Sequence, residues 1–278
     1  MKIFLNLLKT PSFLFGAGCF LLTLCLAFIF PFVYPIDTVT RVGLPYMPPS
    51  ASHWLGTDHM GVDMVSLIVT GLRSSLYVGF LAGIIATGIG TLMGIYAGFK
   101  GGWQDNIITM VTNLFIVIPS FIVLILISSS LKEGRSLALI AGIIGCTTWT
   151  WSARSVRAQA SSLIARDHIA LARVNGTGTF GILLFHILPY LMSYVFMVFI
   201  LQIASGILSE AAISMIGLGP YDSVSLGTLL NESMKNEALG DGAWWAFVPA
   251  AGLITIVVFA FYVINTSMEG VFNPRLRK

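Results

Sequence analysis

The sequence predicts an all-α integral membrane protein with six transmembrane helices and both termini in the cytoplasm. Of its 278 residues, 56% are hydrophobic and only 10% are charged, whereas about 25% of a typical soluble domain is charged. Because so few charges cannot cover a water-facing surface of this size, lipid must be the solvent for most of it. The charges are also spaced so that six long apolar stretches contain no Asp, Glu, Lys or Arg.

Each charge-free stretch predicts one membrane span, because a span needs about 20 mostly apolar residues and a charge at the bilayer centre costs about 2.5–3.5 kcal/mol. The fourth stretch is short, and we expect its helix to continue toward Arg157, whose long side chain can snorkel. The fifth is longer than one span and starts with polar, Gly-rich residues, so the span is placed at 186–207. The stretches are 10–36, 74–99, 106–131, 136–153, 174–209 and 242–268.

The first stretch follows two lysines, as the apolar core of a signal peptide would. It is longer than such a core, and no small-residue cleavage site follows it, so we expect an uncleaved anchor. Orientation follows from the loops, because cytoplasmic loops carry the excess of Lys and Arg. With a cytoplasmic N-terminus, the inside holds Lys2, Lys9, Lys100, Arg154, Arg157, Arg166, Arg173, Arg275, Arg277 and Lys278, against Arg41, Arg73, Lys132, Arg135 and Lys235 outside.

The chain is expected to divide into three parts. Residues 1–36 hold the N-terminus and first span, 37–73 form an external loop, and 74–278 form a core of five spans with a cytoplasmic loop at 154–181. Within the external loop, the apolar run Met64 to Leu72 is too short to span a membrane. It predicts a short helix lying at the outer interface.

The second span carries glycines at helical spacing, Gly90, Gly94 and Gly98. Small residues on one helix face let two backbones approach closely in lipid, so a tightly packed interface is the preferred interpretation. The alternative is the ordinary scatter of glycine in membrane helices. Prolines in or near spans three, five and six predict kinks or helix ends at Pro119, Pro189 and Pro249.

No catalytic motif is found in the sequence: it has no phosphate-binding loop, no H-E-x-x-H, no C-x-x-C and no G-x-S-x-G. The cysteines, Cys19, Cys25 and Cys146, fit neither a disulfide framework nor a zinc site. His53 and His59 lie near two aspartates, which is weak evidence for a metal, so ordinary loop polarity is favoured and no metal site is predicted. The net charge of +3 does not suggest nucleic-acid binding.

Acidic residues inside membranes usually mark ion or proton relays, and this chain offers one candidate, Glu210. We weigh a role in a pathway or outer gate, together with Ser214 and Met215, against an interfacial carboxylate at a helix end. A carrier driven by an ion gradient would normally have more buried charge. The energy for any transport is therefore expected to come from a partner.

The cytoplasmic segment from Leu163 to Val174 reads as a short amphipathic helix that glycines at 176 and 178 terminate. From its residues alone, this helix could bind lipid headgroups or dock into a cytoplasmic protein.

Family motifs favour docking. Ala170-Leu171-Ala172, Gly176 and Ile187-Leu188-Pro189 resemble the "EAA" loop of permeases in ATP-binding-cassette importers, although Ala170 and Leu171 replace its Glu and first Ala. The run H-W-L-G-T-D-H-M-G-V-D at 53–63 is similar to the H-x-L-G-T-D-x-x-G-R-D signature of the dipeptide, oligopeptide and nickel branch, with Val62 in place of Arg. The ending N-P-R-L-R at 273–277 resembles the D-P-R-L-R tail of that branch, so the likeness runs from residue 53 to the end.

This resemblance implies a type I importer permease fold in a bacterial or archaeal cell membrane. It implies a heterodimer with a second, homologous permease, two cytoplasmic ATP-binding subunits that hold the ATP and Mg, and an extracytoplasmic solute-binding protein. The chain itself would bind no cofactor and catalyse no reaction. The substrate stays open between peptides and nickel or a metal chelate, and export or an ion-driven carrier is the alternative function.

The coupling helix of such permeases corresponds to residues 165–178 here. The residues that the resemblance assigns to contact with the ATPase are Arg166, Asp167, His168, Ala170, Ala172, Arg173 and Gly176.

Overall fold

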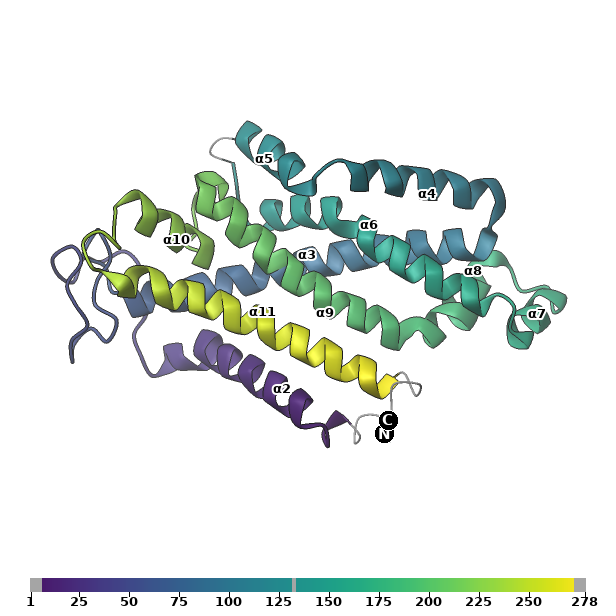
Figure 1. Ribbon diagram of the computed structural model, residues 1–278, viewed down its shortest axis with the longest axis horizontal. Coiled ribbons are helices and arrows are strands. Elements are labelled where there is room, and N and C mark those ends of the chain that lie inside the picture. Colours follow the sequence, from purple (N-terminus) through teal and green to yellow (C-terminus); the bar gives the residue numbers. More distant parts are fainter. Residues whose placement is uncertain (1–6, 132–133, 273–278) are drawn as a thin grey trace.

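The protein is a bundle of long helices in the computed structural model, which describes residues 7–131 and 134–272 (Figure 1). No strand is found in that part of the chain, only two isolated β-bridges in the first loop. The elements are α2 (Pro11–Leu24), η1 (Cys25–Ile29), η2 (Phe30–Phe32), α3 (Met64–Lys100), α4 (Gly102–Val117), α5 (Ser120–Ser130), α6 (Leu137–Leu163), α7 (Asp167–Val174), α8 (Thr179–Gly181), η3 (Ile182–Ile187), α9 (Leu188–Ile213), η4 (Ser214–Leu218), α10 (Leu226–Lys235) and α11 (Trp244–Phe272).

Four continuous helical runs in the described residues are long and apolar enough to cross a membrane: Pro11–Phe32, Met64–Lys100, Thr179–Leu218 and Trp244–Val271. The pair α4 and α5 makes a fifth candidate, bent by 75° between the two helices. Pro119 lies at this bend and ends α4, because proline lacks the N–H that a continuing helix needs. α6 has 27 residues, but its threonines, serines, tryptophans and arginines make it less apolar than the others.

The fifth span is longer than predicted. Residues 186–207 lie inside the helical run Thr179–Leu218, which has 40 residues and includes two π-helical segments. Pro189 sits in the first turn of α9, where proline is tolerated, and Pro249 lies inside α11.

The structure differs from the expected separate interfacial helix, because Met64 to Leu72 form the first turns of the 37-residue α3. Asp63 caps this helix by accepting a hydrogen bond from the Ser66 N–H at 2.9 Å. Arg73, which directly follows the apolar run, donates from Nε to the Ala27 carbonyl oxygen at 2.5 Å. The charge is thus satisfied inside the fold, and the helix continues through it.

The centre of the bundle is α3 packed against α6 and α9. A Cβ on Gly90 would lie 2.4 Å from the Ser152 Cβ, and one on Gly94 would lie 2.6 Å from the Ala153 carbonyl oxygen. A Cβ on Gly98 would lie 2.9 Å from the Ala160 Cβ. The structure therefore places all three glycines on the face of α3 that contacts the α6 backbone.

The external signature run at 53–63 folds into a compact loop that holds the start of α3. Thr57 is fully buried, and its Oγ1 donates to the Leu44 carbonyl oxygen at 2.7 Å and accepts from the Met47 N–H at 2.8 Å. The Thr57 carbonyl oxygen accepts a hydrogen bond from Trp245 Nε1 at 3.1 Å. A Cβ on Gly56, whose φ is +63°, would lie 2.2 Å from the Met47 carbonyl oxygen, so only glycine fits there.

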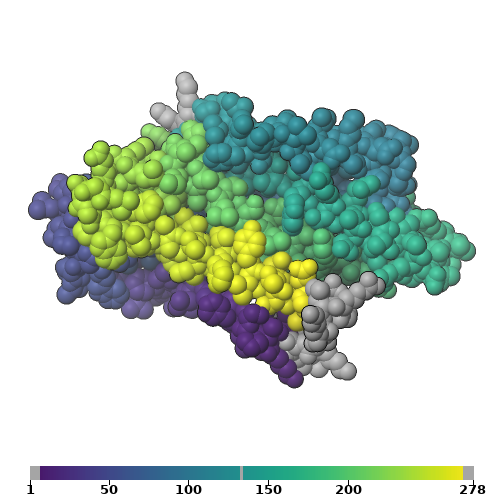
Figure 2. Space-filling model, in the orientation of Figure 1, coloured from purple at the N-terminus to yellow at the C-terminus, as the bar shows by residue number. Residues whose placement is uncertain are grey.

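The bundle has two distinct ends. α7 lies at one end, toward which the beginning of α2 and the end of α11 are directed, and the loop before α3 lies with α10 at the other (Figure 1). α2 and α11 pack together, with Ser267 Oγ donating to Ser12 Oγ at 2.9 Å. On the face that Figure 2 shows, α2 and α11 form one long side of the molecule and α4 and α5 form the other.

Candidate functional site

α7 is a short helix with a well-defined C-terminal end. Gly176 has a φ of +76°, its N–H donates to the Arg173 carbonyl oxygen, and the Thr177 N–H donates to the Ala172 carbonyl oxygen, both at 3.0 Å. This pair of bonds is the Schellman motif, which satisfies carbonyls left open at a helix C-terminus. Glycine is favoured at the left-handed position, since a side chain there strains the backbone.

The two faces of α7 differ in what they contact. Ile169 and Ala172 are buried against the adjoining ends of α3, α6 and the helical run that leads into α9. On the opposite face, Leu171 is 62% exposed and Val174 is 84% exposed. Apolar side chains at i and i+3 therefore point away from the bundle, at its very end.

The residues predicted to dock fall in different places around α7. Arg166 occupies the N-cap position and Asp167 the first turn. His168 stacks on Tyr190 with ring centroids 4.6 Å apart, and the Arg173 guanidinium lies 4.8 Å from the Phe99 ring centroid. Ala170 is exposed beside Leu171, whereas Ala172 is buried. His168 and Arg173 thus hold the helix through their ring contacts, whereas the exposed Ala170 and Leu171 are free to contact a partner.

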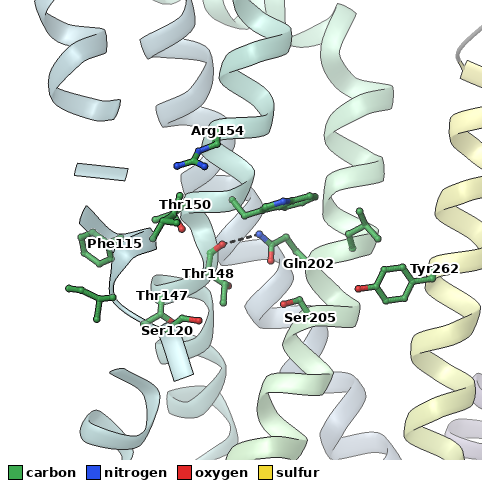
Figure 3. Close-up of a pocket in the computed structure, with 13 residues that line it drawn as sticks. Phe115, Ser120, Thr147, Thr148, Thr150, Arg154, Gln202, Ser205 and Tyr262 are labelled. Carbon is green, nitrogen blue, oxygen red and sulfur yellow. Dashed lines mark hydrogen bonds between the residues drawn. The ribbon is translucent and has the colours of Figure 1, made fainter. Parts of the chain in front are cut away.

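A cavity of about 550 Å³ lies farther along the bundle, between the α4–α5 bend, α6, α9 and α11. Its wall combines aromatic rings with hydroxyl and amide groups, and Figure 3 shows these groups facing one another across it. Arg154 lies at one end of the cavity, with Ser120 and Ser205 at the other (Figure 3). The polar lining residues are Ser120, Thr147, Thr148, Thr150, Arg154, Gln202 and Ser205.

Gln202 fixes one wall of this cavity. Its Nε2 donates to the Thr148 carbonyl oxygen at 3.1 Å and contacts Ser152 Oγ, so α9 is joined to α6 at this level. Arg154 reaches across from α6 to α4, where its NH2 donates to Asn113 Oδ1 at 2.9 Å. Among the described residues, the hydroxyls of Ser120 and Ser205 form no hydrogen bond, so they are available to water or a solute.

An ion pair joins α4 to α6 on the α7 side of the cavity. Arg157 Nε lies 2.5 Å from Asp105 Oδ1, and its NH2 lies 2.6 Å from Oδ2. This two-point geometry is the strongest arrangement for a guanidinium and a carboxylate. It ties the first turn of α4 to α6, so that α4 is anchored here and bends away at Pro119.

Glu210 does not face this cavity in the structure. It is 0% exposed, and it accepts hydrogen bonds from Ser75 Oγ at 2.9 Å and Ser214 Oγ at 2.6 Å. Ser75 Oγ also accepts from the Leu226 N–H at 3.1 Å, so the cluster joins α3, α9 and α10. Met215 packs at the edge of the adjacent apolar core. A gating role for these residues stays a prediction.

The histidines of the external loop have structural partners. His53 Nδ1 lies 3.1 Å from Asp63 Oδ1, and His59 Nε2 lies 3.8 Å from Glu232 Oε2. No group of three or more metal-type ligands occurs in the described part of the chain. In the same loop, hydrogen bonds from Thr40 and Val39 lower the pKa of the Asp37 carboxyl to about 2.

Sequence reasoning located α7 but missed the cavity. One of its polar residues comes from α5, four come from α6 and two from α9, so no single motif gathers them in the sequence. The available signal was Gln202, an amide inside a long apolar run, since such groups in a membrane helix face a cavity or another helix.

Comparison with known proteins decides the family. Residues 90–278 match the family described as "Binding-protein-dependent transport system inner membrane component". The chain belongs to this family. It is therefore a multi-pass membrane permease, the membrane subunit of an ATP-binding-cassette importer. The alternatives, export and an ion-driven carrier, are not favoured.

Several curated permeases are similar over most of their length. The oligopeptide transport system permease protein OppC of Bacillus subtilis is 33% identical over 232 residues, which cover 83% of this chain and 74% of the relative. The dipeptide transport system permease protein DppC of the same organism is 31% identical over 269 residues, 94% of this chain and 82% of the relative. OppC of Mycobacterium tuberculosis is 29% identical over 232 residues, with 83% and 78% coverage.

Proposed function

We propose that this permease forms one half of a peptide import pathway, paired with a second, homologous permease. Two cytoplasmic ATP-binding subunits drive the pair, and an extracytoplasmic binding protein delivers the substrate. The peptide substrate is suggested by the names of the relatives, which are oligopeptide and dipeptide permeases. ATP and Mg would be held by the partner subunits, and this chain would catalyse no reaction.

The observation that carries the proposal is the outward face of α7. Leu171 and Val174 are exposed at the tip of the bundle, while Ile169 and Ala172 fix the helix to the ends of three long helices. An apolar pair rigidly presented in water fits an apolar groove on a partner. A movement of α7 would be transmitted to α3, α6 and α9, because the ends of these helices share one hydrophobic core with it.

We propose six spans, with α6 as the sixth beside the five candidates. α6 is long enough, and its less apolar faces are covered by α3 and α9 or turned to the cavity, so little of its polarity meets lipid. Both termini would then be cytoplasmic, at the same end as α7, with the 37–63 loop and α10 outside. Residues 1–36 would form an accessory anchor, and 74–278 with the first turns of α3 would form the permease core.

The cavity beside the α4–α5 bend is the proposed lining of the pathway. It lies between helices rather than at a helix end, and it has hydroxyl and amide groups that lipid would not solvate. The second permease would close its open side. ATP binding and hydrolysis would switch the pathway between outward and inward access by moving α7.

The test is a matched pair of charge insertions in the reconstituted complex of two permeases, two ATPases and binding protein. Leu171→Glu puts a charge on the proposed docking face, and Leu8→Glu makes the same change at an exposed leucine just before α2, outside the proposed permease core. We expect Leu171→Glu to reduce binding-protein-stimulated ATP hydrolysis at least tenfold and Leu8→Glu to leave it within about twofold. Equal effects would contradict docking through α7.

A further inference from the structure

We infer that Arg154 binds a carboxylate group of the transported solute, so that the pathway selects carboxylate-bearing solutes such as peptides over free metal cations. This inference rests on the proposed function of the cavity. It adds the class of substrate that the cavity accepts and names the residue that recognises it.

The cavity wall has a net positive charge. Arg154 is the one charged side chain among the described residues that line it, and no Asp or Glu is found there. A guanidinium stays protonated at any physiological pH. The cavity therefore has a fixed positive charge, which attracts an anion and repels a divalent cation such as Ni²⁺.

Arg154 differs from Arg157, which lies one helical turn away on α6. Arg157 is neutralised by the two-point contact with Asp105. Arg154 has no carboxylate within 4.0 Å in the described chain and donates only one hydrogen bond, to the neutral amide of Asn113. Arg154 is also exposed, so its guanidinium is accessible to a solute, whereas that of Arg157 is already occupied.

The geometry of the Arg154 guanidinium suits a carboxylate. Because the bond to Asn113 uses one of the five N–H donors of the guanidinium, the side chain is oriented but most of its donors are unused. A planar guanidinium with free donors binds a carboxylate through two parallel hydrogen bonds. The free hydroxyls of Ser120 and Ser205 at the far end of the cavity could then contact polar groups elsewhere on the solute (Figure 3).

The experiment measures uptake in proteoliposomes holding the complete complex, with an alanine tripeptide as the probe and its C-terminal amide as the comparison. The binding protein is the same throughout, so any preference of its own cancels when acid-to-amide uptake ratios are compared between permease variants. We expect Arg154→Gln to lower this ratio about tenfold. The variant loses a charge-assisted contact with the C-terminal carboxylate, and the neutral amide makes that contact only weakly even in the wild type. Arg154→Lys, which keeps the charge but not the fork, should lower it about threefold.

Lys100→Gln is the control, since it removes a positive charge at the α7 end of the bundle but outside the cavity. It should leave the ratio unchanged whatever it does to total uptake. An unchanged ratio in Arg154→Gln overturns the carboxylate site, and if that variant fails to assemble, an unchanged ratio in Arg154→Lys does so. Uptake of ⁶³Ni²⁺ by the wild-type complex would also overturn it, while leaving a permease driven by ATP in place.

Failure of the proposed function would be seen separately. It would appear as tripeptide uptake by the wild-type complex that does not depend on the binding protein or on ATP, and it would overturn the inference too.

Discussion

The contact between α3 and α6 gives a sharp test of the fold, through alanine substitutions at two glycines of α3. A Cβ on Gly94 would lie 2.6 Å from the Ala153 carbonyl oxygen and 3.0 Å from the Arg157 backbone nitrogen. Both are backbone atoms of α6, so no side chain can rotate away. A Cβ on Gly88, in the same helix, would have no atom within 4 Å.

The expected magnitude follows from comparing the two variants. Replacing glycine by alanine inside a helix stabilises it by about 0.5–1 kcal/mol, and both variants share this gain. Gly94→Ala must also separate two packed backbones by nearly 1 Å to reach ordinary contact distance, and overpacking of this kind costs about 1–3 kcal/mol. The difference between the two variants is therefore expected to be about 1–3 kcal/mol, or roughly 5- to 150-fold in the population of unfolded protein.

The assay is thermal unfolding of the purified complex in detergent, followed by the half-life of assembled complex at one fixed temperature, because membrane complexes rarely unfold reversibly. Gly94→Ala should shorten the half-life clearly, and Gly88→Ala should match or exceed the wild type. If both variants behave alike, α3 and α6 do not approach as closely as the structure places them, and the proposed role of these glycines fails.

Three other substitutions test separate parts of the structure. Glu210→Leu leaves the buried Ser75 hydroxyl without its acceptor, so the complex should lose about 1–3 kcal/mol of stability in a denaturant titration, and Glu210→Gln should lose less. Thr57→Val removes the hydroxyl that holds the external loop, and hydrogen exchange over 44–57 should speed up, whereas Thr57→Ser should remain protected. Gly176→Ala strains a left-handed residue, and it should weaken stimulated ATP hydrolysis severalfold, whereas Gly178→Ala, at an ordinary φ of −64°, should not.

The spans could be predicted because lipid imposes one strong rule, the exclusion of charge. Five of the six predicted stretches correspond to helical runs that are long and apolar enough to cross a membrane, if the bent pair α4 and α5 is taken as one span. The continuity of α3 could not be predicted in the same way. Arg73 is accommodated by a carbonyl oxygen from the first helix, and a contact between residues 46 positions apart leaves no trace in local composition.

The candidate site was likewise predictable from the sequence only in part. α7 was predictable because its C-terminal glycine and its amphipathic pattern are local, and the structure places the glycine of the predicted turn in the left-handed conformation. The cavity was not predictable because it exists only after five segments come together, and each contributes residues that are unremarkable alone. Gln202 could have been noticed, but its partners Thr148 and Ser152 lie about fifty residues away.

The most recognisable run in the sequence, at 53–63, does no transport chemistry that the structure supports. Its threonine, glycines and aspartates hydrogen-bond one another, cap α3 and hold Trp245 of α11, and its histidines pair with nearby carboxylates. The match to the family begins at residue 90, so it does not depend on this loop. Substrate selection needs groups that are not committed to the fold, and among the charged side chains of the bundle Arg154 meets that condition, since its neighbour Arg157 is already paired.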